Sequence, residues 1–287
     1  MSGELLRDKH RNGKFTITVE LDPPKSASAQ GTKEQASVLK GIVDGINISD
    51  CPMANARMSP IALAHIIQED CGIETIFHLT CRDRNYIGLQ AELLGAAGLG
   101  VRNILTLTGD HPSRGDTPQA KAVYDADTCS LIRLADGLNH KKDINGKELE
   151  ESSDFYIGAA ANPGNEDQNL EMEKLKNKID SGAGFIQTQP VYDMELAKQF
   201  IERTAHFRIP ILFGLLPLRG FKMASYLHNF VPGITIPDDI MERMEKGGAS
   251  AGIEIAREQY EEIRKIAAGV HIMPLNHIDM VQKIVSP

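Results

Sequence analysis

The sequence predicts a single (β/α)8 barrel that spans residues 1–287. Short runs rich in β-branched and aromatic residues alternate with helical segments along the chain, which is typical of parallel β-α-β units. Eight such units in a chain of 287 residues fit the size of a closed barrel. Polar residues also gather toward the carboxyl ends of several predicted strands, the end at which such barrels build their sites.

The first predicted strand contains the acidic residue on which the later argument depends. Between Phe15 and Leu21, apolar residues alternate with two threonines and Glu20, which is the period of a strand with two different faces. Pro23 and Pro24 end the strand, because proline donates no hydrogen bond to a strand ladder. Glu20 therefore lies near the end of the strand, either solvated at an edge or directed into a pocket.

The next elements follow from capping residues and breakers. A loop of small residues at 26–31 precedes a helix predicted over 32–43, with Thr32 as its N-cap. Gly45 separates this helix from a short strand at 46–49.

A second helix begins at Ser59 and Pro60, with the serine as cap and the proline in the first turn, and continues to Gln68. A strand at 75–80 and a helix at 86–99 complete the third unit.

The remaining chain repeats the alternation. Further strands are predicted at 103–110, 155–160, 184–190, 209–217 and 270–275. Further helices are predicted at 125–138, 166–179, 193–204, 220–228, 238–245 and 251–268, with a terminal helix ending at 284. A polar loop covers 111–120, and a charged segment with an Asn-Gly turn follows the helix that ends at 138.

A doubly wound sheet is the alternative fold, and the glycine pattern argues against it. No G-x-G-x-x-G follows the first predicted strand, where a dinucleotide-binding sheet carries one. The glycines of 95–100 have a different spacing and lie at the end of a predicted helix, so we interpret them as a helix terminus.

The parity of side chains along the strands supports a polar pocket at one end of the barrel. Polar residues share a face in the sets Thr16/Thr18/Glu20, Asn47/Ser49, His78/Thr80, Thr106/Thr108 and Gln187/Gln189. Apolar residues share the opposite face in the sets Phe15/Ile17/Val19, Ile46/Ile48, Phe77/Leu79 and Leu105/Leu107. We expect the polar faces to point inward and the apolar faces to pack beneath the helices, which makes Glu20 a pocket residue.

Composition excludes several classes of protein. The net charge of -8 argues against a nucleic-acid or anionic-membrane surface, because both need clustered Lys and Arg. No apolar run approaches the length of a membrane span, and the charged N-terminus does not read as a signal peptide. The four cysteines are isolated, with no C-x-x-C pair that suggests a metal site, so we expect reduced thiols, no metal and a cytoplasmic location.

Five segments together resemble the methylenetetrahydrofolate reductase family. They are VELDPPK, FHLTC, TLTGDHP, IDSGAGFIQTQPVYD and GLLPLRGFK, in family order between Phe15 and His277. The resemblance implies a flavin-containing barrel, with FAD as cofactor, that reduces 5,10-methylenetetrahydrofolate to 5-methyltetrahydrofolate. It implies the bacterial single-barrel form, with NADH or NADPH as donor, although an electron-transfer subunit is an open alternative.

The resemblance gives Glu20 the role of general acid. The bridging methylene of the folate accepts hydride once its five-membered ring opens to an iminium, and a proton on N10 promotes that opening. We expect desolvation in the barrel mouth to raise the pKa of Glu20, which would keep the carboxyl protonated near neutral pH. The alternative is a carboxylate held in a structural hydrogen-bond network.

The resemblance places the folate on three further residues. Asp110 matches a carboxylate that accepts hydrogen bonds from the pterin; its alternative role is to stabilise a turn before a proline. Gln189 matches a glutamine that binds substrate, or it is a satisfied interior amide. Phe221 matches an aromatic residue that stacks on folate or nicotinamide, or it is an ordinary core residue.

The resemblance also implies a set of flavin contacts. The positions that match are Ser49, Thr108, His78, Tyr124, Asp125, Asp127, Asn162, Lys174 and Lys178. Lys174 and Lys178 lie four residues apart on one helical face, and Lys178 matches a lysine that faces the flavin diphosphate.

Three of the positions depart from the family pattern. Asn162 stands where many members have histidine, and Thr108 and His277 stand where arginine is common. These departures bear on flavin type and affinity rather than on the folate site.

Other functions remain open from the sequence. A pterin-binding barrel without redox chemistry, such as a methyl-group transferase, could use the same Asp110 and Gln189. A flavin-free enzyme with direct hydride transfer and a non-catalytic barrel subunit are further alternatives. The oligomeric state is equally open, because amphipathic outer helices serve both the packing of a barrel and contacts between subunits.

Overall fold

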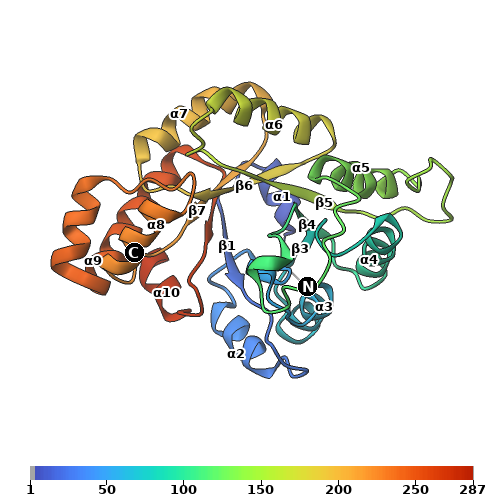
Figure 1. Ribbon diagram of the computed structural model, residues 1–287, viewed down its shortest axis with the longest axis horizontal. Coiled ribbons are helices and arrows are strands. Elements are labelled where there is room, and N and C mark those ends of the chain that lie inside the picture. Colours follow the sequence, from blue (N-terminus) through green and yellow to red (C-terminus); the bar gives the residue numbers. More distant parts are fainter. Residues whose placement is uncertain (1–3, 287) are drawn as a thin grey trace.

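The computed structural model describes residues 4–286 and forms a closed barrel of eight parallel strands. Each strand pairs with the next in the sequence, and β8 pairs with β1 to close the barrel (Figure 1). The strands are β1 (Thr16–Leu21), β2 (Gly45–Ile48), β3 (Thr75–Thr80), β4 (Asn103–Leu107), β5 (Tyr156–Ala161), β6 (Phe185–Pro190), β7 (Ile211–Leu215) and β8 (Gly269–Ile272). The predicted (β/α)8 fold is confirmed.

Helices surround the strands on all sides, as Figure 1 shows. They are α1 (Leu6–Arg11), α2 (Gln30–Leu39), α3 (Pro60–Cys71), α4 (Tyr86–Gly98), α5 (Thr128–Asn139), α6 (Gln168–Asp180), α7 (Met194–Thr204), α8 (Phe221–Phe230), α9 (Asp238–Ile266) and α10 (Asp279–Val285). Short 3-10 turns occur at η1 (Pro52–Ala54), η2 (Pro112–Arg114) and η3 (Ala205–Phe207). None of the helices within 4–286 combines the length and apolar character needed to cross a bilayer.

The barrel encloses an apolar layer at one end only. Leu6, Tyr156, Phe185 and Leu212 pack together inside the barrel near the amino ends of the strands. Leu6 comes from α1 and has no exposed surface, so this short helix closes that end of the barrel. The apolar layer leaves the opposite end, at the carboxyl ends of the strands, for polar side chains.

Helix α1 is not predicted from the sequence, and the contacts of this helix explain why. The helix has six residues, which is too short to be stable by local propensity. Its position depends on residues distant in the sequence: the backbone nitrogen of Leu6 donates to Glu74 (2.7 Å), and Arg7 pairs with Asp154 (2.5 Å). Tertiary contacts therefore determine this helix.

The predicted strand parity is confirmed for β1, β2, β3 and β6 but is wrong for β4. Leu105 and Leu107 face the barrel interior, where Leu105 joins the apolar layer. Thr106 lies on the outer side of the strand with Ile104 and donates to the backbone oxygen of Gly158 (2.9 Å). Leucine and threonine alternate in β4, so the pattern shows two faces without showing which one is inside.

Several helices begin at other residues than predicted, because the residues expected to cap them do not do so. Helix α2 begins at Gln30, and Thr32 is buried within it instead of capping it. Ser59 occupies the N-cap position of α3, but its side chain makes no capping bond. Asp127 caps α5 by accepting from the backbone nitrogen of Ser130 (2.7 Å), so this helix starts at Thr128. The last two predicted long helices form one run, α9, that breaks at Gly248 (φ 53°).

The structure has four cysteines without a disulfide partner: Cys51, Cys71, Cys81 and Cys129.

Replacement of Gly158 by alanine should destabilise the barrel. A Cβ at this inward position of β5 would lie 2.3 Å from the ring of Phe185, so the core must shift. We expect a loss of about 1–3 kcal/mol in the free energy of unfolding, measured by urea denaturation. Gly95→Ala is the control, because no atom lies within 4 Å of a Cβ there and an exposed helix gains about 1 kcal/mol from alanine. Equal stability of the two variants would contradict this packing.

Candidate active site

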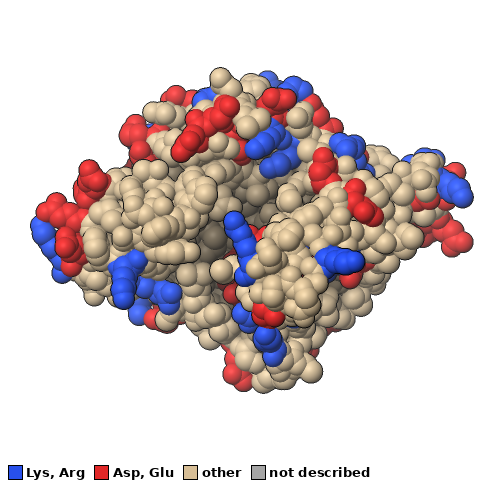
Figure 2. Space-filling model, in the orientation of Figure 1, with Lys and Arg blue, Asp and Glu red and all other residues tan. Residues whose placement is uncertain are grey.

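A hollow opens at the carboxyl ends of the strands and contains the predicted folate residues. Figure 2 shows it near the centre of this face, with basic side chains at its edge. The cavity has a volume of about 270 Å³, and Glu20, Asp110 and Gln189 all line it. Ser49 and His78, predicted as flavin contacts, line the same cavity. Five residues from separate parts of the sequence thus share one space.

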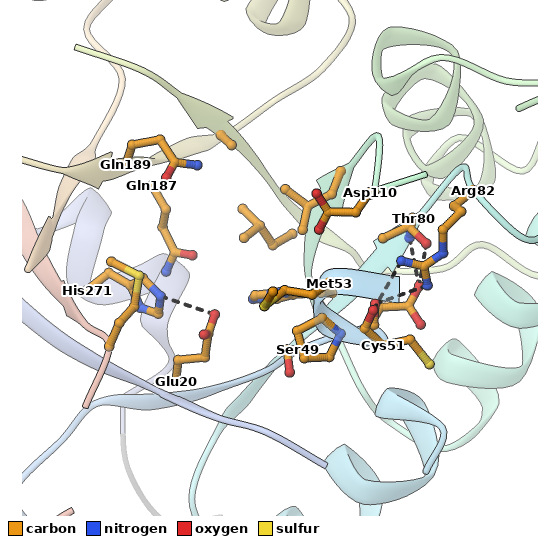
Figure 3. Close-up of a pocket in the computed structure, with 18 of the residues that line it drawn as sticks. Glu20, Ser49, Cys51, Met53, Thr80, Arg82, Asp110, Gln187, Gln189 and His271 are labelled. Carbon is orange, nitrogen blue, oxygen red and sulfur yellow. Dashed lines mark hydrogen bonds and ion pairs between the residues drawn. The ribbon is translucent and has the colours of Figure 1, made fainter. Parts of the chain in front are cut away.

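Glu20 faces a histidine that the sequence analysis did not single out. About a quarter of the Glu20 side chain is exposed, and its Oε2 lies 3.8 Å from Nε2 of the buried His271 (Figure 3). His271 comes from β8, where it shares the inward face with Gly269 and Met273. Strand parity in the predicted eighth strand is the signal that could have identified it.

The electrostatics of Glu20 differ from the prediction. Desolvation by burial raises the pKa of the carboxyl, as expected from the sequence. The imidazole of His271, 3.8 Å away, and the positive charge of His78 and His271, when protonated, act in the opposite direction and outweigh burial. The pKa of Glu20 therefore lies below its ordinary value, and the predicted increase is wrong. Two imidazoles beside one carboxyl are the physical reason.

A chain of buried hydrogen bonds forms the floor of the cavity. The side-chain nitrogen of Asn47 donates to Oε1 of Gln187 (2.7 Å) and to Nε2 of His78 (2.9 Å). The side-chain nitrogen of Gln187 donates in turn to Oδ1 of Asn47 (3.2 Å) and to the hydroxyl of Thr18 (3.3 Å). The chain links β3, β2, β6 and β1 across the barrel interior. Desolvation lowers the pKa of His78 to about 4, so His78 is neutral at pH 7.

An ionic network after β2 and β3 supports one wall of the cavity. Asp50 pairs with Arg84 (2.8 Å), and Arg82 donates to the backbone oxygens of Cys51 (3.1 Å) and Asp50 (3.3 Å). Cys51 and Met53 have positive φ values of 47° and 54°, conformations that L residues rarely adopt without such support. The network holds this loop so that Met53 lines the cavity (Figure 3). The sequence analysis missed these residues.

Asp110 is available to a ligand. Its carboxylate is exposed, and the nearest basic group is Arg114 at 3.7 Å. The turn that follows is stabilised instead by His111, whose Nδ1 accepts from the backbone nitrogen of Ser113 (3.2 Å). The alternative turn-stabilising role of Asp110 therefore has no hydrogen bond to support it. Gln189 is also exposed and lines both this cavity and the one beside it.

A second cavity of about 640 Å³ adjoins the first and shares Ala160 and Gln189 with it. Predicted flavin residues line it: Thr108, Asp127, Asn162, Lys174 and Lys178. Its two carboxylates bond backbone groups, because Asp127 caps α5 and Glu171 accepts from the backbone nitrogen of Asn162 (2.7 Å).

Two lysines bring cationic groups to this second cavity, beside the carboxylates of Asp127 and Glu171. Lys178 donates to the backbone oxygen of Ala160 (2.6 Å), and burial lowers the pKa of its amine. Lys174 reaches the cavity from the same face of α6. The two ammonium groups are donors that fit an anionic group such as a diphosphate.

The family model described as methylenetetrahydrofolate reductase matches residues 5–287. The chain belongs to the methylenetetrahydrofolate reductase family.

Two curated relatives carry the family name. Methylenetetrahydrofolate reductase 1 of Schizosaccharomyces pombe is 26% identical over 300 residues, which cover 95% of this chain and 45% of that protein. 5,10-Methylenetetrahydrofolate reductase of Escherichia coli is 24% identical over 288 residues, which cover 93% of this chain and 88% of that protein. The chain thus spans less than half the length of the fission-yeast relative and most of the length of the bacterial one.

Among solved structures, an uncharacterized protein from Clostridium thermocellum that binds two copies of 5-methyl-5,6,7,8-tetrahydrofolic acid has the same fold. The TM-score is 0.64, the sequence identity is 18%, and the match covers 98% of both chains.

Three residues predicted from the family pattern lie outside the walls of both cavities. The hydroxyl of Tyr124 donates to the backbone oxygen of Gly109 (3.0 Å), which ties two loops together. Asp125, the residue after Tyr124, is exposed, and Phe221 is 40% exposed at the start of α8. Within residues 4–286, no group of three or more His, Cys, Asp or Glu side chains could hold a metal ion.

Replacement of His78 by glutamine should reduce the dependence of stability on pH. The pKa of His78 is about 4 in the folded chain, below its ordinary 6.5, so the unfolded chain binds more protons between these values. Stability therefore falls as the pH falls from 6.5 toward 4, by up to about 1 kcal/mol per pH unit from this residue. Glutamine can still accept from Asn47. Urea denaturation at several pH values should show a shallower slope for H78Q than for the wild type; parallel slopes would contradict the assignment.

Proposed function

We propose that this chain catalyses the flavin-dependent reduction of 5,10-methylenetetrahydrofolate to 5-methyltetrahydrofolate. The observation that carries the proposal is the shared cavity of Glu20, Asp110 and Gln189, which brings an acid, a carboxylate and an amide around one space. Membership of the reductase family supports the reaction. The Clostridium thermocellum protein of the same fold, which binds 5-methyl-5,6,7,8-tetrahydrofolic acid, supports a folate as ligand.

Asp110 and Gln189 orient the folate. The carboxylate of Asp110 accepts hydrogen bonds, and an aminopyrimidine edge offers adjacent N–H donors to it. The amide of Gln189 both donates and accepts, which matches the mixed edge of a pterin. Because the two side chains come from two different strands, after β4 and in β6, they hold the ring in one orientation near Glu20.

Glu20 provides the acid. Protonation of N10 favours opening of the five-membered ring, and the resulting iminium carbon is the hydride acceptor. A positioned acid typically contributes about 10²–10⁴-fold to the rate. The proposal is supported by the inward direction of Glu20, whose carboxyl lines the cavity that would receive the folate.

FAD is the cofactor that the two adjoining cavities fit best. The cavity near Lys174 and Lys178 suits the diphosphate, and the cavity around Glu20 suits the reactive ring. When bound in its reduced form, the flavin would supply the hydride. We infer a ping-pong order, in which the donor leaves before the folate binds, because a single cavity of about 270 Å³ around Glu20 has little room for both at once. NADH, NADPH or a reduced electron-transfer subunit are the candidate donors.

Replacement of Glu20 by glutamine should stop folate reduction. Glutamine keeps the size of the side chain and removes the transferable proton, so reoxidation of the reduced protein by methylenetetrahydrofolate should slow by about 10²-fold or more. Reduction of the flavin by the donor should remain within about twofold of the wild-type rate. Anaerobic stopped-flow absorbance separates the two half-reactions.

The control for this experiment is Glu69→Gln, an exposed carboxylate on α3, which should leave both half-reactions unchanged. If E20Q reoxidises as fast as the wild type, Glu20 is not the acid. A colourless purified protein that binds the folate without oxidising or reducing it would instead indicate a pterin-binding barrel without redox chemistry.

Replacement of Lys174 by glutamine should weaken FAD binding. Loss of one cation beside the diphosphate should raise the dissociation constant about tenfold, which is about 1.4 kcal/mol. Lys176→Gln is the matched control, because Lys176 is exposed on the same helix and pairs with Asp180 outside the cavity. Fluorescence titration of the cofactor-free protein measures both constants. Equal affinities for the two variants would contradict placement of the diphosphate near Lys174.

A further inference from the structure

His271 has no role in the proposal so far, yet it is the residue that faces Glu20. Its imidazole is buried in β8, with Nε2 directed at the carboxylate (3.8 Å) and Nδ1 at the hydroxyl of Thr18 (3.0 Å), as Figure 3 shows for the first pair. None of the sequence motifs accounts for a histidine at this point of the barrel. The hydrogen bonds of the His271 ring indicate that it can gain and lose a proton here.

The Thr18 hydroxyl allows His271 to gain or lose a proton without leaving a buried atom unpaired. When Nδ1 carries hydrogen, the hydroxyl accepts from it and donates to the backbone oxygen of Val270 (3.4 Å). When Nδ1 lacks hydrogen, the hydroxyl can turn and donate to it. The amide of Gln187 donates to the same hydroxyl in both cases. A hydroxyl has one donor and two acceptor positions, which is sufficient for both states.

The other histidine of the cavity lacks this freedom. Nε2 of His78 accepts from the side-chain nitrogen of Asn47 (2.9 Å), and that amide exchanges two hydrogen bonds with Gln187. A proton on this Nε2 would face a donor unless both amides turned together, and burial lowers the pKa of His78 to about 4, so His78 is neutral at pH 7. Of these two rings, His271 is therefore the one that can accept a proton and stand beside the acid.

We propose that His271 is a positioning residue that stores the proton which Glu20 passes to the substrate. The inference rests on the proposed function. In the step, the Nε2–H bond of His271 breaks as the carboxylate of Glu20 takes the proton, which leaves a neutral imidazole. The new O–H bond of Glu20 then breaks as N10 of the folate gains that proton, which returns Glu20 to a carboxylate. Solvent returns one proton when the product leaves, so one proton and one hydride are consumed in each turnover.

The charged surroundings favour this arrangement once a ligand covers the cavity. The remaining titratable groups near the pair are Asp22 after β1, Asp50 after β2, His78 in β3, Asp110 after β4, and Arg82 at the rim. Removal of water from the exposed quarter of Glu20 strengthens its attraction for a protonated ring. The 3.8 Å separation can then shorten to a hydrogen bond, as is common when catalytic groups bind substrate.

The test is His271→Gln in the flavin-loaded protein. Reoxidation by methylenetetrahydrofolate should slow by about tenfold or more near pH 7.5, while flavin reduction by the donor stays unchanged. The pH above which reoxidation falls should also move down by about one unit or more, because two groups that share a proton retain it to higher pH than one. His140→Gln, an exposed histidine after α5, is the control and should change neither quantity.

A second variant distinguishes loss of the proposed role of His271 from a folding defect. Thr18→Val keeps the imidazole and removes its adjustable partner, so it should slow reoxidation less than H271Q and shift the pH profile in the same direction. In addition, nitrogen NMR of the cofactor-free protein near neutral pH, well above the His78 pKa of about 4, should show ring signals of His271 that respond to pH, whereas those of His78 do not. This measurement needs no turnover.

The outcomes separate this inference from the proposed function. If the wild-type protein is not reoxidised by methylenetetrahydrofolate, the proposed function fails. If the wild type is reoxidised but H271Q matches it, or loses rate equally at every pH, the role of His271 is refuted. Ring signals of His271 that do not respond to pH would also refute it.

Discussion

The paired amides of Asn47 and Gln187 are the interaction on which the site depends. They join β2 to β6 across the barrel interior and separate the apolar layer near α1 from the cavity above. Inside a closed barrel, a polar group without a partner costs on the order of 1–3 kcal/mol, so each inward amide must bond another inward side chain. The amide pair therefore determines the orientation of both neighbours, His78 on one side and Thr18 on the other.

The amide pair also influences the surroundings of the acid, Glu20. Thr18 contacts His271, and His271 faces Glu20, so the environment of the carboxyl is set by residues on β1, β6 and β8. Burial alone would favour a protonated carboxyl, whereas the imidazole of His271 and, when it is protonated, that of His78 favour the carboxylate. The acid must therefore act together with its neighbours. This is a property of the assembled barrel mouth and of no single motif.

The two adjoining cavities differ in the charged side chains that line them. The chain has a net charge of -8, yet the carboxylates beside Lys174 and Lys178 are engaged by backbone nitrogens of α5 and of the loop after β5. The ammonium groups of the two lysines remain available as donors to an anion, which suits a cofactor diphosphate. The cavity around Glu20 holds exposed carboxylates and amides instead, which suits a neutral ring with several N–H donors.

The sequence by itself determined the (β/α)8 fold, the position of Glu20 at the end of β1, and the placement of Glu20, Asp110 and Gln189 at one end of the barrel. Period-2 patterns, breakers and the parallel topology are local signals, and parallel strands bring their carboxyl ends together. Only the tertiary structure decided which face of β4 is inside, that α1 closes the barrel, and that His271 stands against Glu20. Each of these depends on contacts between residues far apart in the chain. The lowered pKa of Glu20 has the same origin, because the field at a buried carboxyl comes from neighbours that the fold alone brings near.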